Sequence, residues 1–300
     1  MQSVRPAPLA VVALILMSLI WGYNWVVMKK VIAYVDPFDF SAVRTLFGAV
    51  TLFLMLVILR RPMKVVALRK VALLGLLQTA AFTGLIQWAL VAGGAGKTAV
   101  LVYTMPFWVV PMARWVLDER VRGAQWFAIA VAALGLLLVL QPWAMHGTAL
   151  SNLLAIGGGL SWAAATVLAK RMRRDHDFEL LSLTAWQMLF GALALCVVAV
   201  LHPSRPIDPT PYFFGALVYN AVLATGLAWL LWLYVLQHLS TGLAGLSTLG
   251  IPMIGAFAGW LELGERPNTV EFAGMLLIGA ALALISLVAL WQSRRIRIAG

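Results

Sequence analysis

Charged side chains are scarce in this chain of 300 residues: 11% are Asp, Glu, Lys or Arg, whereas 63% are hydrophobic. Such a composition excludes an ordinary soluble protein. The apolar residues run in long blocks, such as residues 126–140, instead of alternating with polar ones, which disfavours a transmembrane β-barrel. Because a bilayer-spanning helix needs roughly 20 mostly apolar residues, the composition supplies about nine or ten such helices.

The middles of the apolar blocks also lack carboxylates and histidines, which all fall in connections or near the expected helix ends. Intramembrane proteases, metalloenzymes and retinal proteins need a Ser–His pair, clustered His or acids, or a midspan Lys, and none of these is apparent. We therefore expect no catalytic site, no metal, no cofactor and no enzyme activity. A proton-driven pump needs an ionisable relay within the membrane, so transport without proton coupling is favoured.

The single cysteine, Cys196, excludes an intrachain disulfide. The net charge of +11 raises nucleic acid as a partner, but the basic residues form short clusters between apolar blocks, at 60–70, 170–174 and 294–297. Clusters of this kind contact lipid headgroups and mark the cytoplasmic side. We therefore expect membrane lipids and no nucleic acid as partners, with both termini on the cytoplasmic side of the cell inner membrane.

Apolar blocks separated by charged or Gly/Pro-rich segments predict an all-α polytopic membrane protein with ten transmembrane helices. They are expected near residues 9–31, 39–59, 71–92, 98–117, 124–141, 152–169, 180–201, 212–236, 243–261 and 270–291. The connections are short and leave no room for a soluble catalytic domain. The start of the chain is similar to a secretory signal, but it lacks a convincing cleavage site, which predicts a retained first helix.

The two halves of the sequence carry matching residues in the same order and at nearly the same spacing. The pairs are Trp21 with Trp162, Lys29 with Lys170, Gly48 with Gly191, Thr83 with Thr225, Pro106 with Pro252, and Glu119 with Glu265. Five helices per half, an odd number, invert the second half relative to the first, as in many transporters. We predict two inverted repeats, residues 1–146 and 147–300; duplication that merely enlarged a bundle is the alternative.

At these residues the chain resembles the EamA-type ten-helix members of the drug/metabolite transporter superfamily. The resemblance rests on Trp-Gly-Tyr-Asn-Trp at 21–25, on Pro37 followed by Arg44, and on a proline followed thirteen residues later by Glu-Arg in both halves. The second half departs from the first where Gln187 stands near the position of Arg44. The chain is most similar to YddG-type exporters of aromatic and other neutral amino acids. This implies a central cavity between the halves, lined by the first, third, fourth, sixth, eighth and ninth helices.

Uncharged polar and aromatic residues within the expected helices are the candidate substrate-binding residues. They are Trp21, Asn24, Gln78, Thr79, Thr83, Gln87, Tyr103, Ser161, Trp162, Gln187, Asn220, Ser247 and Thr248. Amides, hydroxyls and aromatic faces suit a neutral or zwitterionic solute, although such polar groups also join membrane helices. Pro106 and Pro252 lack backbone donors at matched positions, and we expect them to mark gating segments.

The sequence thus predicts an inner-membrane transporter, sufficient as a monomer, that exports small neutral or aromatic amino acids and related amphipathic metabolites by alternating access. A drug or other metabolite carrier of the same superfamily, including a nucleotide-sugar carrier, is the alternative. A phosphate-bearing substrate would need several midspan cations, and only Arg44 approaches that depth. A membrane-embedded enzyme or a receptor is less favoured.

Overall fold

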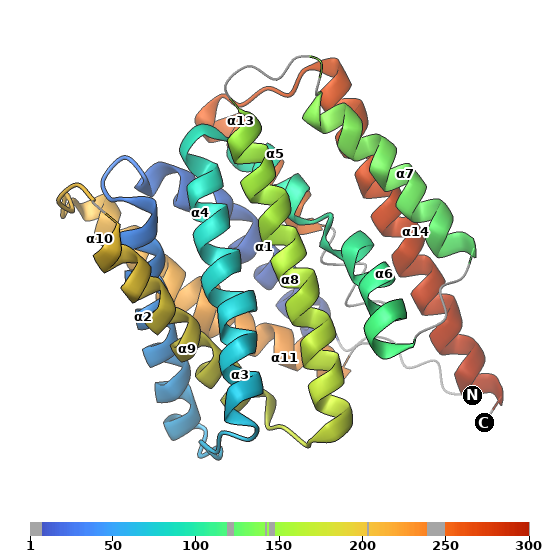
Figure 1. The fold of residues 1–300 in the computed structure, drawn as a ribbon, viewed down its shortest axis with the longest axis horizontal. Coiled ribbons are helices and arrows are strands. Elements are labelled where there is room, and N and C mark those ends of the chain that lie inside the picture. Colours follow the sequence, from blue (N-terminus) through green and yellow to red (C-terminus); the bar gives the residue numbers. More distant parts are fainter. Residues whose placement is uncertain are drawn as a thin grey trace.

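The computed structural model describes residues 8–118, 123–141, 143, 148–202, 204–238 and 250–299, and within these residues it contains helices and no strand (Figure 1). The helices, in chain order, are α1 (Pro8–Val31), α2 (Pro37–Ile58), α3 (Leu68–Leu74), η1 (Gly75–Ala81), α4 (Phe82–Ala92), α5 (Ala95–Val102), α6 (Met105–Leu117), α7 (Gly123–Leu140), α8 (Ala149–Asp175), α9 (Leu180–Leu201), α10 (Pro211–Val218), η3 (Tyr219–Leu227), α11 (Ala228–His238), α13 (Gly250–Leu263) and α14 (Thr269–Ala299). The expected all-α class is confirmed.

Among the described residues, eight helical stretches are long and apolar enough to cross a membrane: Leu9–Val31, Pro37–Ile58, Leu68–Ala92, Ala95–Leu117, Gly123–Leu140, Ala149–Asp175, Leu180–Leu201 and Pro211–Trp232. They correspond to the first eight expected helices. Two shorter apolar stretches, Gly250–Leu263 and Thr269–Leu284, lie where the ninth and tenth were expected. Part of the ninth expected span, 243–249, lies outside the described residues. The chain is a multi-pass membrane protein.

Local sequence explains where several of these helices begin and end. The carboxylate of Asp36 accepts a hydrogen bond from the N–H of Phe38 at 3.0 Å, and Pro37 occupies the first turn of α2, where its missing N–H costs nothing. Thr210 and Pro211 start α10 in the same way. Gly264 follows α13 with a φ of 67°, in the left-handed region that ends a helix and favours glycine.

Two of the membrane helices contain a π-helical segment, which the sequence analysis did not predict. The helix α3–η1–α4 contains η1, and the helix α10–η3–α11 contains η3. A π-helix has a different main-chain hydrogen-bond register from an α-helix and is rare in proteins. The π-helical segments that do occur often lie at functional sites. Ser161 of α8 donates a hydrogen bond to the main-chain oxygen of Leu77 in η1 at 2.7 Å. Trp21 of α1 donates its indole N–H to the oxygen of Ala224 in η3 at 2.8 Å.

Helices of the first half pack on helices of the second, and most contacts have a counterpart with the halves exchanged. The helix α2 packs on η3, and α9 packs on η1. Likewise α1 packs on α11 and α13, whereas α8 packs on α4 and on α5–α6. Three further pairs, α2 with α9, α5 with α13 and α7 with α14, join corresponding helices of the two halves. Figure 1 shows α7 and α14 side by side along one edge of the bundle.

Glycines permit the closest of these contacts. A Cβ atom at Gly191 of α9 would lie 2.3 Å from Cβ of Thr79 in η1, and one at Gly48 of α2 would lie 3.0 Å from the methyl group of Thr225 in η3. Small residues of this kind let membrane helices approach closely and gain van der Waals contact. Both π-helical segments are therefore held by a glycine from the other half of the chain.

Candidate functional site

Three aromatic residues predicted to bind substrate, Trp21, Tyr103 and Trp162, each make contacts between the two halves. The ring of Trp162 in α8 lies 5.8 Å from that of Tyr103, measured between centroids, and 5.0 Å from that of Phe82. Trp21 and Tyr103 both pack against a cluster of buried apolar residues that includes Ile251 of α13. We call Trp21, Tyr103 and Trp162 the central aromatic group; all three side chains stay partly exposed.

The central aromatic group depends on a break in the helix that contains Tyr103. The helix α5 ends at Val102, the chain turns at Tyr103 and Thr104, and α6 begins with Pro106 in its first turn. Pro106, one of the two expected gating residues, therefore lies three residues after Tyr103, on the other side of the break. Pro252, the other, is buried near the described start of α13. The gating role of both prolines stays a prediction.

A second aromatic contact widens this group on the side of η3. The ring of Trp21 lies 5.9 Å from that of Trp229 and 6.4 Å from that of Trp232, both in α11. Aromatic pairs at these separations gain edge-to-face attraction in addition to burial. The sequence analysis did not include either partner, although the cluster of tryptophans at 229 and 232 was visible in the sequence.

Most of the predicted polar residues lie between helices and are buried. They are Asn24, Thr79, Thr83, Gln87, Gln187 and Asn220. Gln87 of α4 donates a hydrogen bond to the main-chain oxygen of Met28 in α1 at 3.0 Å. The amide oxygens of Asn24, Gln87 and Gln187 are buried without a hydrogen-bond partner. Gln78 is partly exposed, as is Ser161 beside η1. Ser247 and Thr248 lie outside the described residues.

Charged residues tie the halves together at one end of the bundle, a feature that the sequence analysis missed. Glu265 accepts hydrogen bonds from the main-chain N–H groups of Ala95 and Gly96, at 2.7 and 3.0 Å, and so caps α5. A carboxylate is favourable at the positive end of a helix. Within the first half, Lys29 of α1 donates a hydrogen bond to the main-chain oxygen of Leu90, in the last turn of α4, at 2.6 Å. The recurrence of the Glu-Arg motif was the available signal for Glu265.

A second charged group lies near the same end. Glu262, which was expected near a helix end, accepts hydrogen bonds from the hydroxyl of Tyr23 at 2.6 Å and from the Nζ atom of Lys30 at 2.5 Å. The side chains of the Lys30–Glu262 ion pair are 37% and 33% exposed. An ion pair with this exposure adds little stability, because water screens it. Glu262 therefore contacts α1 from α13.

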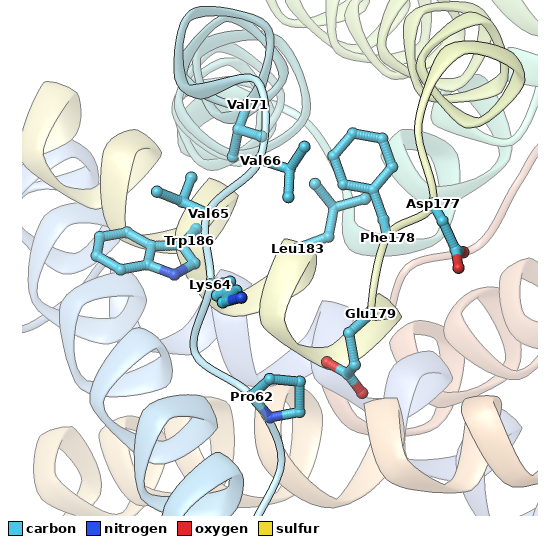
Figure 2. Close-up of a pocket in the computed structure, with 10 residues that line it drawn as sticks. All are labelled: Pro62, Lys64, Val65, Val66, Val71, Asp177, Phe178, Glu179, Leu183 and Trp186. Carbon is cyan, nitrogen blue, oxygen red and sulfur yellow. The ribbon is translucent and has the colours of Figure 1, made fainter.

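The described residues also form a pocket of about 180 Å³ at the opposite end of the bundle (Figure 2). It lies between the α2–α3 connection, which supplies Lys64 and Val65, and the α8–α9 connection, which supplies Phe178. Leu183 and Trp186 of α9 complete its apolar lining. None of the predicted substrate-binding residues lines this pocket.

Among the residues that the structure describes, no group of three or more His, Cys, Asp or Glu is placed to hold a metal ion.

Comparison with known families decides the class of the protein. Residues 8–141 and 149–287 match the model of the EamA-like transporter family. The chain belongs to this family. The resemblance to the drug/metabolite transporter superfamily is thereby confirmed, and the family indicates a membrane transporter instead of an enzyme.

Individual relatives of this EamA-like transporter match over most of their length. "Uncharacterized transporter YoaV" of Bacillus subtilis (strain 168) is 30% identical over 271 residues, which cover 88% of this chain and 92% of the relative. A "Probable amino-acid metabolite efflux pump" of Escherichia coli (strain K12) is 25% identical over 280 residues, with 89% and 91% covered. One crystal structure covers 93% of this chain and 98% of its own, with a TM-score of 0.66 and 18% identity, which shows a common fold.

Proposed function

We propose that this EamA-like transporter exports small neutral or aromatic amino acids and related amphipathic metabolites across the cell inner membrane. The central aromatic group carries the proposal: its three rings are partly exposed, Tyr103 contacts Trp162 of the other half, and Trp21 packs on the apolar cluster that Tyr103 also contacts. Such rings pack on an apolar or aromatic side chain, and their faces attract an ammonium group. The similarity to a relative named as an amino-acid metabolite efflux pump supports the same substrate class.

Buried amide oxygens on α1 and α4 offer acceptors for an ammonium group. Asn24 lies one turn before Met28 on the same face of α1, and Gln87 of α4 hydrogen-bonds to Met28. Both amides keep a buried oxygen without a protein partner. An unsatisfied buried acceptor costs about 1–3 kcal/mol, which a donor from the solute or an ordered water would recover.

The proposed mechanism is alternating access by two inverted repeats, residues 1–146 and 147–300. Three observations support it: the exchange of partners between the halves, the π-helical segments in the third helix of each half, and the paired contacts Gly48–Thr225 and Gly191–Thr79. Related halves that pack about a pseudo-two-fold axis can exchange conformations and so open a central site to either side. A monomer with both termini in the cytoplasm is sufficient for this mechanism.

We further propose that transport is not coupled to protons. In the described residues, the carboxylates lie within two turns of helix ends or in connections. Glu262, which contacts Tyr23, is paired with Lys30 and is a third exposed. A carboxylate that stays ionised beside a cation does not supply the midspan proton relay that pumps use.

A drug or other metabolite carrier, including a nucleotide-sugar carrier, is the second candidate. The central aromatic group also suits a lipophilic cation, which needs ring faces and no carboxylate partner. A diphosphate, in contrast, would require several cations near the site, and Arg44 alone approaches midspan in the described residues.

Efflux from proteoliposomes tests the substrate class and the coupling together. Vesicles are loaded with labelled phenylalanine, leucine, a cationic dye or a nucleotide sugar, and efflux is measured with and without a pH gradient. We expect efflux of the amino acids at rates that do not depend on the gradient. Efflux of the dye or nucleotide sugar alone would favour the second candidate, and acceleration by a pH gradient would contradict uncoupled transport.

A further inference from the structure

Arg44 is a half-buried cation whose hydrogen-bonding capacity is only partly used. It stands seven residues after Pro37 in α2, about 10 Å along the helix at a rise of about 1.5 Å per residue. Its Nη1 atom donates to Oδ1 of Asn220 at 2.9 Å. Its Nε atom is buried without a hydrogen-bond partner, and among the described residues no acceptor takes a hydrogen bond from Nη2. The side chain stays partly accessible.

In the part of the chain that the structure describes, Arg44 forms no ion pair with a carboxylate. The three ion pairs found there join Lys30 to Glu262, Lys70 to Asp175 and Lys97 to Glu271. Arg44 instead has the amide oxygen of Asn220 and the ring of Phe40, whose centroid lies 6.0 Å from Cζ. A cation inside a membrane protein is costly without an opposite charge, so residues of this kind are usually functional.

The second half of the chain provides an internal comparison. The helix α9 packs on η1 as α2 packs on η3, and near the position of Arg44 it carries the neutral Gln187. The α9–η1 contact is closer still, because a Cβ at Gly75 would lie 2.4 Å from the main-chain oxygen of Gln187. A helix of this family can therefore pack on a π-helical segment without a guanidinium. Packing alone does not explain the charge at Arg44.

Asn220 holds the guanidinium in a defined orientation. Its side-chain nitrogen donates to the main-chain oxygen of Ala216 at 3.0 Å, which turns its oxygen toward Arg44. Asn220 is fully buried and lies in the first turn of η3, beside Tyr219. Because Nη1 is hydrogen-bonded to Asn220, the edge of the guanidinium formed by Nε and Nη2 is left to bind another acceptor. Those two N–H groups are parallel and match the two oxygens of a carboxylate.

We infer that Arg44 and Asn220 form a binding site for the carboxylate of the transported solute, bound side-on to Nε and Nη2. The inference rests on the proposed function, because it assigns the recognition of one end of an amino acid. A free inorganic anion such as chloride would satisfy the same guanidinium edge, and a comparison of acetate with chloride distinguishes the two sources. The sequence predicted Asn220 as a substrate-binding residue, but it did not predict the contact between Asn220 and Arg44.

Binding by the purified full-length chain in nanodiscs tests the inference. The probes are L-phenylalanine and its α-carboxamide, which differ in the carboxylate, together with acetate and chloride. We expect phenylalanine to bind about tenfold or more tightly than the carboxamide, as for a hydrogen bond to a charged group. Arg44→Gln and Asn220→Asp should both abolish this preference, because the affinity for phenylalanine falls much more than the affinity for the carboxamide. Lys70→Gln, which removes an exposed cation at the other end, should keep the preference.

Asn220→Asp separates recognition from folding. The substitution gives Arg44 a carboxylate within the protein and removes the donor to Ala216, so a purely structural role predicts a change in thermal stability with an unchanged preference. Retention of the preference in both variants overturns the inference, and so does a response to chloride equal to that to acetate. If the unsubstituted protein binds neither phenylalanine nor the carboxamide, the proposed substrate class fails. The carboxylate site then stands if acetate still stabilises the protein in an Arg44-dependent way, and falls if it does not.

Discussion

The indole N–H of Trp21 and the main-chain oxygen of Ala224 form a hydrogen bond of 2.8 Å across 203 positions of the sequence. The bond joins α1 of the first half to the π-helical segment η3 of the second. It positions one ring of the central aromatic group directly against a helix whose main-chain register is altered. In the proposed function, Trp21 therefore connects the recognition of the solute to the conformation of η3.

Trp21→Phe should weaken this connection while an aromatic ring is kept. The oxygen of Ala224 loses its indole donor, and we expect the free energy of unfolding to fall by about 1 kcal/mol, the net value of one hydrogen bond. Thermal unfolding followed by circular dichroism measures the change. Trp115→Phe is the matched control, because Trp115 is 82% exposed and has no such contact. Equal stability of the two variants would show that the bond contributes nothing.

Gly191→Ala should destabilise the α9–η1 contact. The added Cβ would lie 2.3 Å from Cβ of Thr79, and overpacking of this kind costs about 1–3 kcal/mol. Gly48→Ala should cost less, because its Cβ would lie 3.0 Å from the nearest atom of Thr225. Gly215→Ala in α10 is the control: nothing lies within 4 Å, so the substitution should be stabilising. The order of the three melting temperatures is the measurement, and any other order contradicts the packing described here.

Glu265→Gln should loosen the end of the bundle at which Glu265 caps α5. The charge of the carboxylate favours the positive helix end by about 0.3–1 kcal/mol, and more where it is partly buried. We expect α5 and α13 to separate more often. A cysteine introduced at Ala256, in a chain with Cys196→Ala, should then react faster with a maleimide, because Ala256 contacts Gly96 across this interface. An unchanged rate would show that the cap does not hold this end closed.

Gly94→Ala probes the same contact without removal of the charge. Its Cβ would lie 2.9 Å from Oε2 of Glu265, so the carboxylate would have to move from the N–H groups of Ala95 and Gly96. We expect the same increase in the reactivity of the cysteine at position 256 as for Glu265→Gln. The double variant should show no further increase, since both changes act on one contact. Additive effects would indicate two separate causes.

The extent of the helices was predictable because it depends on local properties of the sequence. Long apolar blocks determine the spans, and Asp36 with Pro37 determines the start of α2. The π-helical segments were not predictable, because their main-chain register depends on partners such as Ser161 and Trp21 from distant helices. A 3.6-residue pattern contains no signal for them.

The candidate site was predictable in its aromatic part and less so in its charged part. Trp21, Tyr103 and Trp162 were predicted from the spans, and the structure places Tyr103 against Trp162 and both Trp21 and Tyr103 against one apolar cluster. The contacts of Arg44 with Asn220 and of Glu265 with α5 join residues about half the chain apart. Their geometry follows from the packing of the two halves, which residue type and spacing do not specify.

Counterflow in proteoliposomes tests the central claim most directly. Vesicles loaded with unlabelled phenylalanine and diluted into labelled phenylalanine, at equal pH on both sides, should accumulate label transiently, because a carrier that alternates access exchanges one solute for another. Trp162→Ala should reduce this accumulation strongly, whereas Trp115→Ala should leave it unchanged. The absence of label accumulation by the unsubstituted protein, or an equal rate for Trp162→Ala, would contradict an amino-acid exporter that binds its solute at the central aromatic group.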